Sequence, residues 1–374
     1  MAAKDALEDA SGPIVVYGAS GYTGKLISAE LGRRGARIVV AGRDRGKLEA
    51  LVSDLGGGVE IAAVPLSDPA GLRELIGRGT AVIGCAGPFT LHGEPLIEAA
   101  AESGTHYLDT TGEQPFIRAA FERHGDAACR SGAALVSGMG FDYAPGDMLA
   151  ALTAEGLDSI DELTLAYSIR GFGATRGTAL SALEMVRVGG VEWREGELRP
   201  TPRYVGGGTF EFPSPIGARR VGRYPGGEQI MVPRHLRVGT VRTLIDLRSV
   251  LPLPLGPLGA TAMSAGGLAM ATPLRGAVGG LIARLPEGPS ESERKAVRFT
   301  IVCELRAGEE RRRGIVRGSD VYGITAVLLA EGAARMARGG PRESGALAPA
   351  QAFEPASFMR SLEPFGVSVE IEPA

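Results

Sequence analysis

A glycine-rich turn after the first apolar segment constrains this chain more than any other feature. The apolar run IVVY at 14–17 leads into GASGYTG at 18–24, and an amphipathic stretch follows over 23–34. The spacing G-x-x-G-x-x-G between a strand and a helix is typical of dinucleotide-binding turns. The alternative is an ordinary glycine-rich turn, because the chain holds 56 glycines. The strand–turn–helix setting favours dinucleotide binding.

Each glycine of this turn has a predicted role. Gly18 permits the tight turn, Gly21 lets the backbone approach a pyrophosphate, and Gly24 allows close packing of helix on sheet. The N–H groups at the start of the helix would bind the phosphates. The predicted phosphate-binding residues are Gly18, Ala19, Ser20, Gly21, Tyr22, Thr23 and Gly24.

Apolar runs alternate with amphipathic stretches through the first 140 residues. We expect strands at 14–17, 37–41, 59–64, 80–84, 105–109 and 133–137, and helices near 23–34, 44–55, 69–77, 92–103 and 114–130. This alternation predicts an α/β fold, a Rossmann-type doubly wound parallel sheet with helices on both faces.

The residues after the second expected strand favour NADP(H) over NAD(H). Arg43 is the first side chain past that strand and Lys47 is close behind, so a 2′-phosphate could be held by a guanidinium. Asp44 leaves an alternative, since it could bind a ribose hydroxyl or cap the next helix.

Ligands of doubly wound sheets lie across the carboxyl ends of the strands, so later turns contribute further candidates. Asp68 follows the third strand and would contact adenine or, alternatively, cap a helix. Small residues after the fourth strand would let the dinucleotide pass, and a polar turn after the fifth would border the nicotinamide. These cofactor-binding candidates are Cys85, Ala86, Gly87, Pro88 and Thr110.

The pattern changes after about residue 156. Stretches at 161–171, 241–250 and 297–318 alternate like half-buried strands, a hairpin is expected at Glu195-Gly196, and helices are expected at 177–188 and 322–340. A short helix near 354–362 and a strand near 367–371 would close the chain. We expect a tail at 1–13, a dinucleotide-binding domain at 14–155, an inserted α+β domain at 156–318 for substrate binding or dimerisation, and a return to the first domain at 319–374.

Composition excludes several classes of function. A formal net charge of −3 gives no general attraction to nucleic acid. The three cysteines and four histidines lack metal-ligand spacing, so no metal site is expected. The first residues, MAAKDALEDASG, are charged and lack the apolar core of a secretory signal, which favours a cytoplasmic protein.

An uncharged stretch at 249–274 bears on the substrate. Its prolines and small residues make a poor spanning helix, although its length would suffice. Apolar walls suit a small lipophilic substrate, or a peripheral contact with a membrane or a carrier protein. The alternative is plain core or the interface of a homodimer, which is the oligomer we expect.

With these residues in hand, the chain resembles the saccharopine dehydrogenase-like reductases, most of all their trans-acting enoyl reductase branch. The motifs that carry the resemblance are GASGYTG at 18–24, AGR at 41–43, CAGPFTLHGEPLIEAAAESGTHYLDTTGE at 85–113, GMGFDYAPGD at 138–147, GTALSALE at 177–184 and the 322–340 helix. It covers roughly the whole chain, least well at 190–300. It implies a Rossmann domain with an inserted α+β domain, and an NADPH-dependent reduction of a C=C bond in a polyketide-derived or acyl-type intermediate. True saccharopine reductases in the group act on a C=N bond instead.

Hydride transfer often needs a proton donor, and no Tyr-x-x-x-Lys pair is present. The catalytic candidates are Tyr143 and Asp142 after the sixth strand and Glu113 after the fifth. Their alternatives are structural: a tyrosine between two domains and a helix-capping acid. A protein that binds NADP(H) without catalysis remains a competing interpretation.

Overall fold

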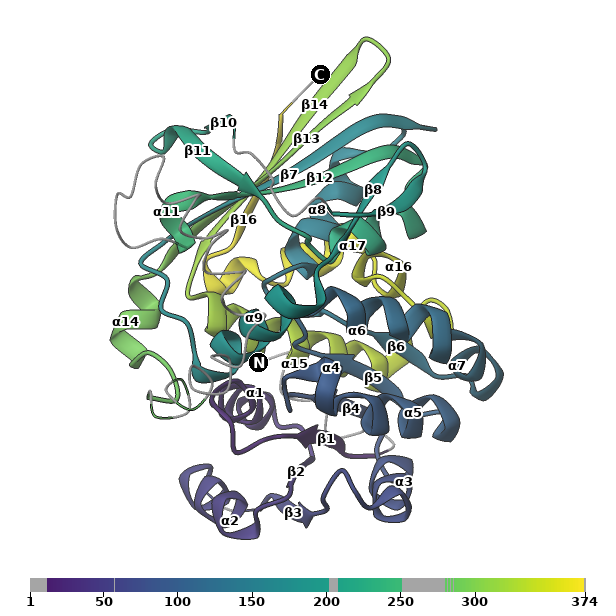
Figure 1. The fold of residues 1–374 in the computed structure, drawn as a ribbon. Coiled ribbons are helices and arrows are strands. Elements are labelled where there is room, and N and C mark those ends of the chain that lie inside the picture. The colour runs from purple at the N-terminus through teal and green to yellow at the C-terminus, as the bar shows by residue number, and fades with distance from the viewer. Residues whose placement is uncertain are drawn as a thin grey trace. The chain divides into compact units, whose positions relative to one another are not determined.

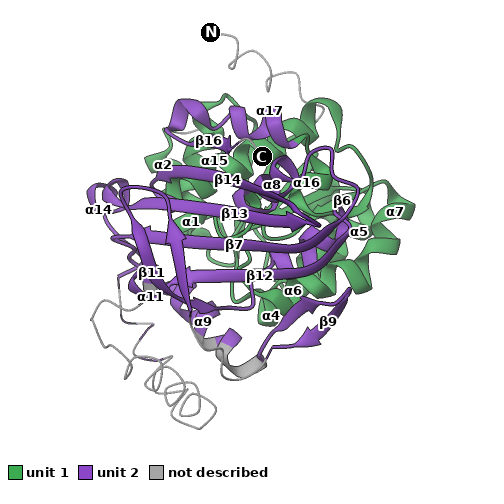
Figure 2. Ribbon diagram, turned by 90° about the horizontal axis from the view of Figure 1, so that it is seen from above, with its two compact units in different colours: residues 1–144, 322–354 green, residues 145–321, 355–374 purple. Residues whose placement is uncertain are grey.

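The computed structural model describes residues 12–56, 58–201, 208–250, 280, 282, 284 and 286–372. The chain divides into two compact units, which Figure 2 colours separately: residues 1–144 with 322–354, and residues 145–321 with 355–374. Most of the expected tail at 1–13 and nearly all of the uncharged stretch at 249–274 lie outside the described residues.

The first unit contains a seven-stranded sheet in the order β15-β6-β5-β4-β1-β2-β3 (Figure 1). Every pairing in it is parallel. Its strands are β1 (Ile14–Tyr17), β2 (Ile38–Gly42), β3 (Glu60–Ala63), β4 (Ala81–Gly84), β5 (His106–Asp109), β6 (Ala134–Val136) and β15 (Gly345–Ala346). The order reverses between β1 and β4, so the predicted doubly wound parallel sheet is confirmed.

Helices cover both faces of this sheet because its strands are apolar on both sides. On one face, Tyr107 of β5 joins a cluster with Leu72, Leu96 and Phe116. On the other face, Leu108 lies against Gly332. The helices of the unit are α1 (Tyr22–Arg33), α2 (Arg45–Asp54), α3 (Pro69–Gly77), α4 (Phe89–His92), α5 (Glu94–Ser103), α6 (Gln114–Ala119), a π-helical turn (Ala120–His124), α7 (Gly125–Ser131), α15 (Val321–Gly339) and α16 (Pro349–Ala352).

The second unit is built on a mixed sheet in the order β10-β11-β12-β7-β13-β14-β16. Among the strands that the structure describes in this sheet, only β12 and β7 pair in parallel, so the expected mostly antiparallel sheet is found. Its strands are β7 (Ile160–Arg170), β10 (Thr209–Phe212), β11 (Gly217–Arg223), β12 (Val238–Asp246), β13 (Arg298–Ala307), β14 (Glu310–Ser319) and β16 (Ser368–Glu372). A separate hairpin, β8 (Val191–Arg194) and β9 (Glu197–Pro200), turns at Glu195 and Gly196, as predicted.

Short helices accompany this sheet. They are α8 (Ala144–Thr153), α9 (Arg176–Val188), α10 (Glu228–Met231), a 3-10 turn (Val232–Arg234), α11 (Leu247–Val250), α14 (Glu291–Ala296), α17 (Pro355–Arg360) and a second 3-10 turn (Glu363–Phe365). The hairpin of β10 and β11, absent from the sequence prediction, places Phe210 and Phe212 over Ala166 and Val302 of the sheet.

Two expected boundaries differ from the structure. The dinucleotide-binding domain was expected to end at 155, but the first unit ends at Ala144, and Leu149 and Thr153 of α8 lie against Gly314 of β14. The chain was also expected to return to the first domain over 319–374. Residues 322–354 do so, whereas β16 pairs with β14 at the edge of the mixed sheet.

Among the described residues, no helix combines the length and the apolar character that crossing a membrane requires.

An ionic network joins α1 to α15 within the first unit. Arg34 binds Glu30 at 2.7 Å and Glu331 at 2.6 Å, and Arg335 binds Glu331 at 2.8 Å. Burial alone would raise the pKa of Glu331, but the hydrogen bonds from Arg335 and Arg34 outweigh it and hold that pKa below its ordinary value.

We predict that Glu331→Gln lowers the free energy of unfolding by roughly 1–3 kcal/mol at pH 7, because two half-buried guanidinium groups lose a charged partner. The pKa of Glu331 is lower in the folded protein than in the unfolded chain. The stabilisation is therefore complete at pH values above the unfolded pKa, and it is lost as the pH falls through the folded pKa. Chemical denaturation at pH 7 and pH 4 measures both effects. Glu291→Gln, in an exposed pair with Lys295, is the control and should change little. Equal losses in the two variants would contradict the prediction.

Candidate functional site

In the turn after β1, packing within the first unit requires glycine at two of the three glycine positions. Gly18 has φ +81°, and a Cβ there would lie 3.0 Å from the backbone nitrogen of Ala86. A Cβ on Gly24 would lie 2.5 Å from the carbonyl oxygen of Gly18. Any side chain at either position would therefore displace backbone.

Gly21 differs from these two glycines. It is exposed, and the nearest atom to its Cβ position is the Gly18 oxygen at 3.4 Å. No tight packing explains a glycine here, and its role beside a pyrophosphate stays a prediction. Tyr22, the first residue of α1, lies edge-on against Tyr322 of α15 with ring centroids 5.4 Å apart.

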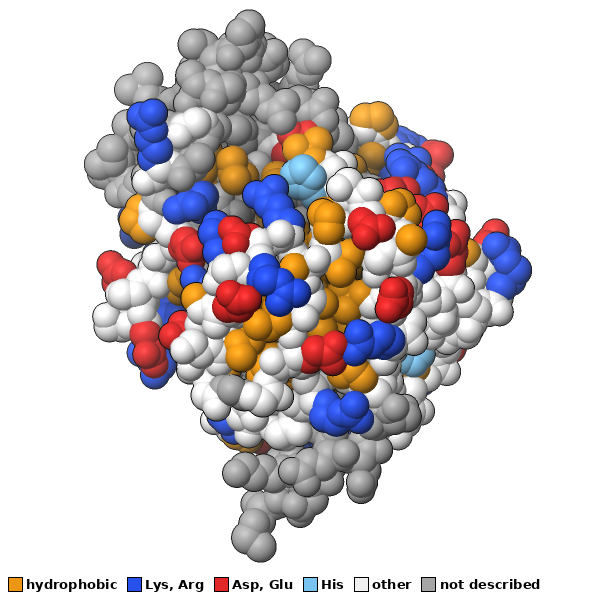
Figure 3. Space-filling view, turned by 90° about the horizontal axis from the view of Figure 1, so that it is seen from below, with side chains coloured by type: hydrophobic (Ala, Val, Ile, Leu, Met, Phe, Trp, Pro, Cys, Tyr) orange, Lys and Arg blue, Asp and Glu red, His pale blue; other side chains and the backbone are white. Residues whose placement is uncertain are grey.

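Arg43 lies at the carboxyl end of β2, next to the turn. Its side chain is exposed and forms no ion pair with any residue that the structure describes. Many other arginines do pair, such as Arg118 with Glu122 at 2.6 Å, and Figure 3 shows basic and acidic side chains next to one another on the face that it draws. Arg43 is thus available to an anionic ligand.

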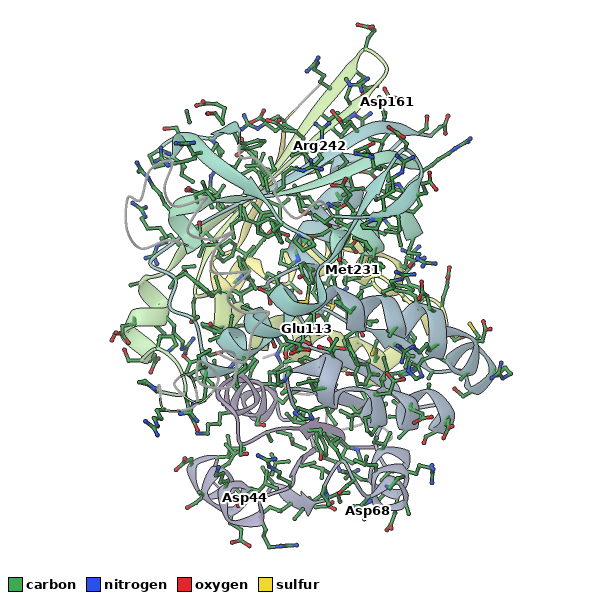
Figure 4. The ribbon with its side chains drawn as sticks, in the orientation of Figure 1. Asp44, Asp68, Glu113, Asp161, Met231 and Arg242 are labelled. Atoms are coloured by element: carbon green, nitrogen blue, oxygen red, sulfur yellow. The ribbon has the colours of Figure 1, made fainter. Side chains whose placement is uncertain are left out.

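The other two charged candidates on this side of the sheet have local partners. Asp44 caps α2 by accepting a hydrogen bond from Lys47 N at 3.1 Å, and Lys47 Nζ lies 3.9 Å from the same carboxylate. Asp68 caps α3 by accepting from Gly71 N at 3.0 Å. Figure 4 shows both aspartates at the starts of these helices. The helix-capping alternatives therefore hold for Asp44 and Asp68, while contacts of Lys47 and Asp68 with a cofactor stay predictions.

The loop after β4 is held by Glu113, which Figure 4 labels above α4. This fully buried carboxylate accepts hydrogen bonds from Phe89 N at 2.7 Å and from Thr90 N at 2.9 Å, and from the Thr90 hydroxyl. It caps the start of α4 and so fixes the preceding residues 85–88. Burial raises the pKa of Cys85 within this loop far above the ordinary thiol range, as does the neighbouring Asp109, so Cys85 is no nucleophile.

Asp109, the last residue of β5, connects the next two loops. One oxygen of its fully buried carboxylate accepts from Thr111 N at 2.9 Å and from Gly138 N at 2.8 Å. Thr111 in turn accepts from Glu113 N at 3.0 Å. Two buried carboxylates therefore tie together the loops that follow β4, β5 and β6.

The residues after β6 complete this arrangement. Tyr143 is buried and donates its hydroxyl proton to Gly112 O at 2.8 Å. Asp142 stands over the same glycine, with Oδ2 3.7 Å from the position of a Gly112 Cβ. The Asp142 side chain touches solvent, yet the protein crowded around it disfavours its charged form and raises its pKa to about 6.

The structure thus separates the three catalytic candidates. The Glu113 carboxylate caps the start of α4, and the Tyr143 hydroxyl donates a hydrogen bond to the carbonyl oxygen of Gly112. Asp142 alone combines an accessible carboxyl with a raised pKa, which fits a proton donor. The described residues contain no group of three or more metal-ligating side chains.

Sequence reasoning missed the contribution of α15 to this region. Thr325 accepts a hydrogen bond from Phe141 N at 3.1 Å, and its methyl group lies 3.3 Å from the Cβ position of Gly140. Tyr322, one turn earlier, packs on Tyr22. The helix itself was predicted, but no motif links 322–325 to loops almost two hundred residues away.

Comparisons with known proteins agree with this geometry. Residues 14–139 match the model of the saccharopine dehydrogenase NADP binding domain, which confirms NADP(H) as the predicted cofactor of this domain. A Mycobacterium tuberculosis relative, whose name as a trans-acting enoyl reductase is provisional, is 36% identical over 184 residues, 46% of this chain and 44% of that protein. A saccharopine dehydrogenase-like oxidoreductase of Rattus norvegicus is 32% identical over 152 residues, 36% of this chain and 35% of that protein.

These matches span less than half the length of the curated relatives. The fold likeness extends further, to apo saccharopine dehydrogenase (L-Glu forming) from Saccharomyces cerevisiae, with a TM-score of 0.60 over 97% of this chain and 100% of that chain, at 13% identity. Residues 14–139 are therefore similar to the NADP-binding domain of the saccharopine dehydrogenases, and the matching parts of the chain are similar to oxidoreductases that carry this domain.

Proposed function

We propose that this protein is an NADPH-dependent reductase that transfers a hydride to a C=C bond of a lipophilic biosynthetic intermediate of polyketide or acyl type. The observation that carries the proposal is a glycine-rich turn after β1 beside an exposed arginine, Arg43, that follows the adjacent strand β2 and forms no ion pair with any described residue. The names of the relatives support a reductase, and those in the enoyl reductase group favour a C=C bond.

The described residues fit an NADP molecule. Gly21 leaves open space where a pyrophosphate would approach, and the first turn of α1 presents its N–H groups there. Arg43 would hold the 2′-phosphate with two donors. The tied loops after β4, β5 and β6 would border the nicotinamide, with Thr110 in the second of them. When bound, NADPH supplies the hydride.

The chain's own residues would supply the proton and form the walls of the substrate site. Asp142, in its acid form, would deliver a proton to the carbon next to the one that accepts the hydride. Glu113 and Asp109 would keep the loops in place, so that the substrate meets the nicotinamide in one orientation. The uncharged sequence at 249–274 favours a lipophilic substrate; whether it also contacts a membrane, a carrier protein or a second copy stays a prediction.

A substrate panel tests the proposed reaction. NADPH oxidation should be fastest with α,β-unsaturated acyl thioesters or related enoyl compounds, and slow with imines and ketones of similar size. Faster turnover of a cyclic imine would assign the protein to C=N reduction instead. Tight NADPH binding with no turnover of any compound would favour a protein that binds NADP(H) without catalysis.

We predict that Arg43→Ala weakens NADPH binding by roughly ten- to a hundredfold, the worth of one or two charge-assisted hydrogen bonds. NADH binding should change little, because NADH lacks the 2′-phosphate. Isothermal titration of both cofactors measures the difference. Arg45→Ala, which removes an exposed partner of Glu49, is the matched control. Equal losses for NADPH and NADH in the Arg43 variant would refute the assignment.

We also predict that kcat/KM falls as the pH rises through about 6, the raised pKa of Asp142, because a proton donor acts only while protonated. Asp142→Asn should abolish this fall of kcat/KM with pH. It should also lower kcat/KM at pH 6 by about a hundredfold, a typical contribution of general acid catalysis. Tyr143→Phe should leave the fall of kcat/KM with pH in place. An unchanged pH profile in the Asp142 variant would exclude it as the donor.

A further inference from the structure

Tyr17 is the last residue of β1, and its ring crosses the end of β2. Tyr17 pairs with Ala41 of β2, yet its hydroxyl donates a hydrogen bond to Val64 O, one residue past β3, at 2.8 Å. Since β2 lies between β1 and β3 in the sheet (Figure 1), the ring spans β2 to reach this oxygen. One side chain therefore connects the ends of three neighbouring strands.

Arg43 follows β2 at the point that the Tyr17 ring crosses. Val64 N donates a hydrogen bond to Gly42 O at 2.9 Å, so the residue that binds the Tyr17 hydroxyl also binds the residue before Arg43. Ala41 and Arg43 are two residues apart, so an extended chain directs their side chains to the same face of the sheet. On that face Tyr17 and Ala41 pack in one cluster. The hydroxyl and the guanidinium thus belong to one face and one end of the sheet.

The electrostatics of the Tyr17 hydroxyl agree with this placement. Tyr17 is 3% exposed, and burial raises its pKa to about 12, while the positive charge of Arg43 acts in the opposite direction. A cation has this effect on a buried phenol only when it lies near the hydroxyl. The guanidinium and the phenol oxygen are therefore neighbours, as the strand register indicates.

A neutral oxygen suits an arginine that has to bind a phosphate. The Tyr17 proton is donated to Val64 O, so the hydroxyl oxygen keeps a lone pair for another donor. A carboxylate in its place would neutralise the guanidinium, whereas a phenol oxygen orients it and leaves its charge for an anion. Arg43 is exposed and forms no ion pair with any described residue, so no acid in the described part of the chain competes for it.

We propose that Tyr17 is a specificity-determining residue for NADPH that acts through Arg43. In the complex, the Tyr17 oxygen accepts a hydrogen bond from the Arg43 guanidinium, whose other N–H groups bind the 2′-phosphate. Tyr17 is a positioning residue, because it contacts the partner of the phosphate and not the reacting atoms. The inference rests on the 2′-phosphate contact of Arg43 in the proposed function, and it does not depend on which bond is reduced.

Tyr17→Phe removes the hydroxyl and keeps the ring. We expect NADPH to bind roughly three- to tenfold more weakly, the worth of one hydrogen bond, and NADH to bind about as tightly as to the unchanged protein. Isothermal titration of the full chain measures both affinities, at a temperature where circular dichroism shows that the variant is folded. Equal losses for the two cofactors would show that Tyr17 acts through the Val64 backbone alone, and no loss would leave the hydroxyl a purely structural role. Either result overturns the proposal.

A double-mutant cycle tests whether Arg43 transmits the effect. In the Arg43→Ala background, Tyr17→Phe should leave the NADPH affinity unchanged, because no guanidinium remains to be oriented. Losses that add in the double variant would refute the coupling. Tyr107→Phe, which removes another buried hydroxyl of the same sheet, on β5, is the matched control and should change the NADPH and NADH affinities by the same factor. A loss confined to NADPH in this control would also count against Tyr17.

A crystal structure of the full chain with NADP⁺ decides the matter if Tyr17→Phe does not fold. We expect Tyr17 Oη within hydrogen-bond distance of one Arg43 nitrogen while another Arg43 nitrogen contacts the 2′-phosphate. A guanidinium that binds the phosphate but is directed away from Tyr17 would overturn the proposal. If Arg43→Ala kept the preference for NADPH over NADH, the 2′-phosphate contact in the proposed function would fail as well. An effect of Arg43→Ala without an effect of Tyr17→Phe would refute this inference alone.

Discussion

Two buried carboxylates hold the part of the first unit on which its chemistry would depend. Asp109 ties the loop after β5 to the loop after β6, and Glu113 caps the helix that follows the loop after β4. Backbone N–H groups at the ends of parallel strands have no partner within the sheet, and these acids supply it. Burial makes these carboxylates unfavourable when they have no partner. It also strengthens the hydrogen bonds that they accept and restricts those bonds to one geometry. A ligand that crosses the strand ends would therefore meet a surface that is already formed.

Two ionisable side chains near these loops and the glycine-rich turn, Arg43 and Asp142, are accessible to a ligand. Arg43 is exposed without a partner among the described residues, and the accessible Asp142 carboxyl has a pKa raised to about 6. Other candidates of the same chemical types are occupied: Asp44 and Asp68 cap helices, and the Tyr143 hydroxyl binds Gly112. On the proposed function, one arginine would therefore recognise the cofactor and one acid would transfer the proton.

Sequence reasoning reached the first unit because its signals are local. A strand such as IVVY followed by glycines and an amphipathic helix is recognisable within twenty residues, and all six expected strands of the parallel sheet exist. The parts that were missed depend on distant partners. Strand β16 joins β14, α8 packs on Gly314, and Thr325 reaches the loop after β6. Likewise, the sequence alone leaves Glu113 open between catalysis and capping, because only the fold brings Phe89 and Thr90 to its carboxylate.

In the proposed function, NADP lies across the carboxyl ends of the parallel strands, with Arg43 at one end and the loops tied by Asp109 and Glu113 at the other. A crystal structure of the protein with NADP⁺ bound tests this most directly. We expect the 2′-phosphate to lie within hydrogen-bond distance of the Arg43 guanidinium, the pyrophosphate to lie over Gly21, and the nicotinamide C4 to face Asp142. A 2′-phosphate directed away from Arg43, or a nicotinamide that contacts none of the three loops, would contradict it.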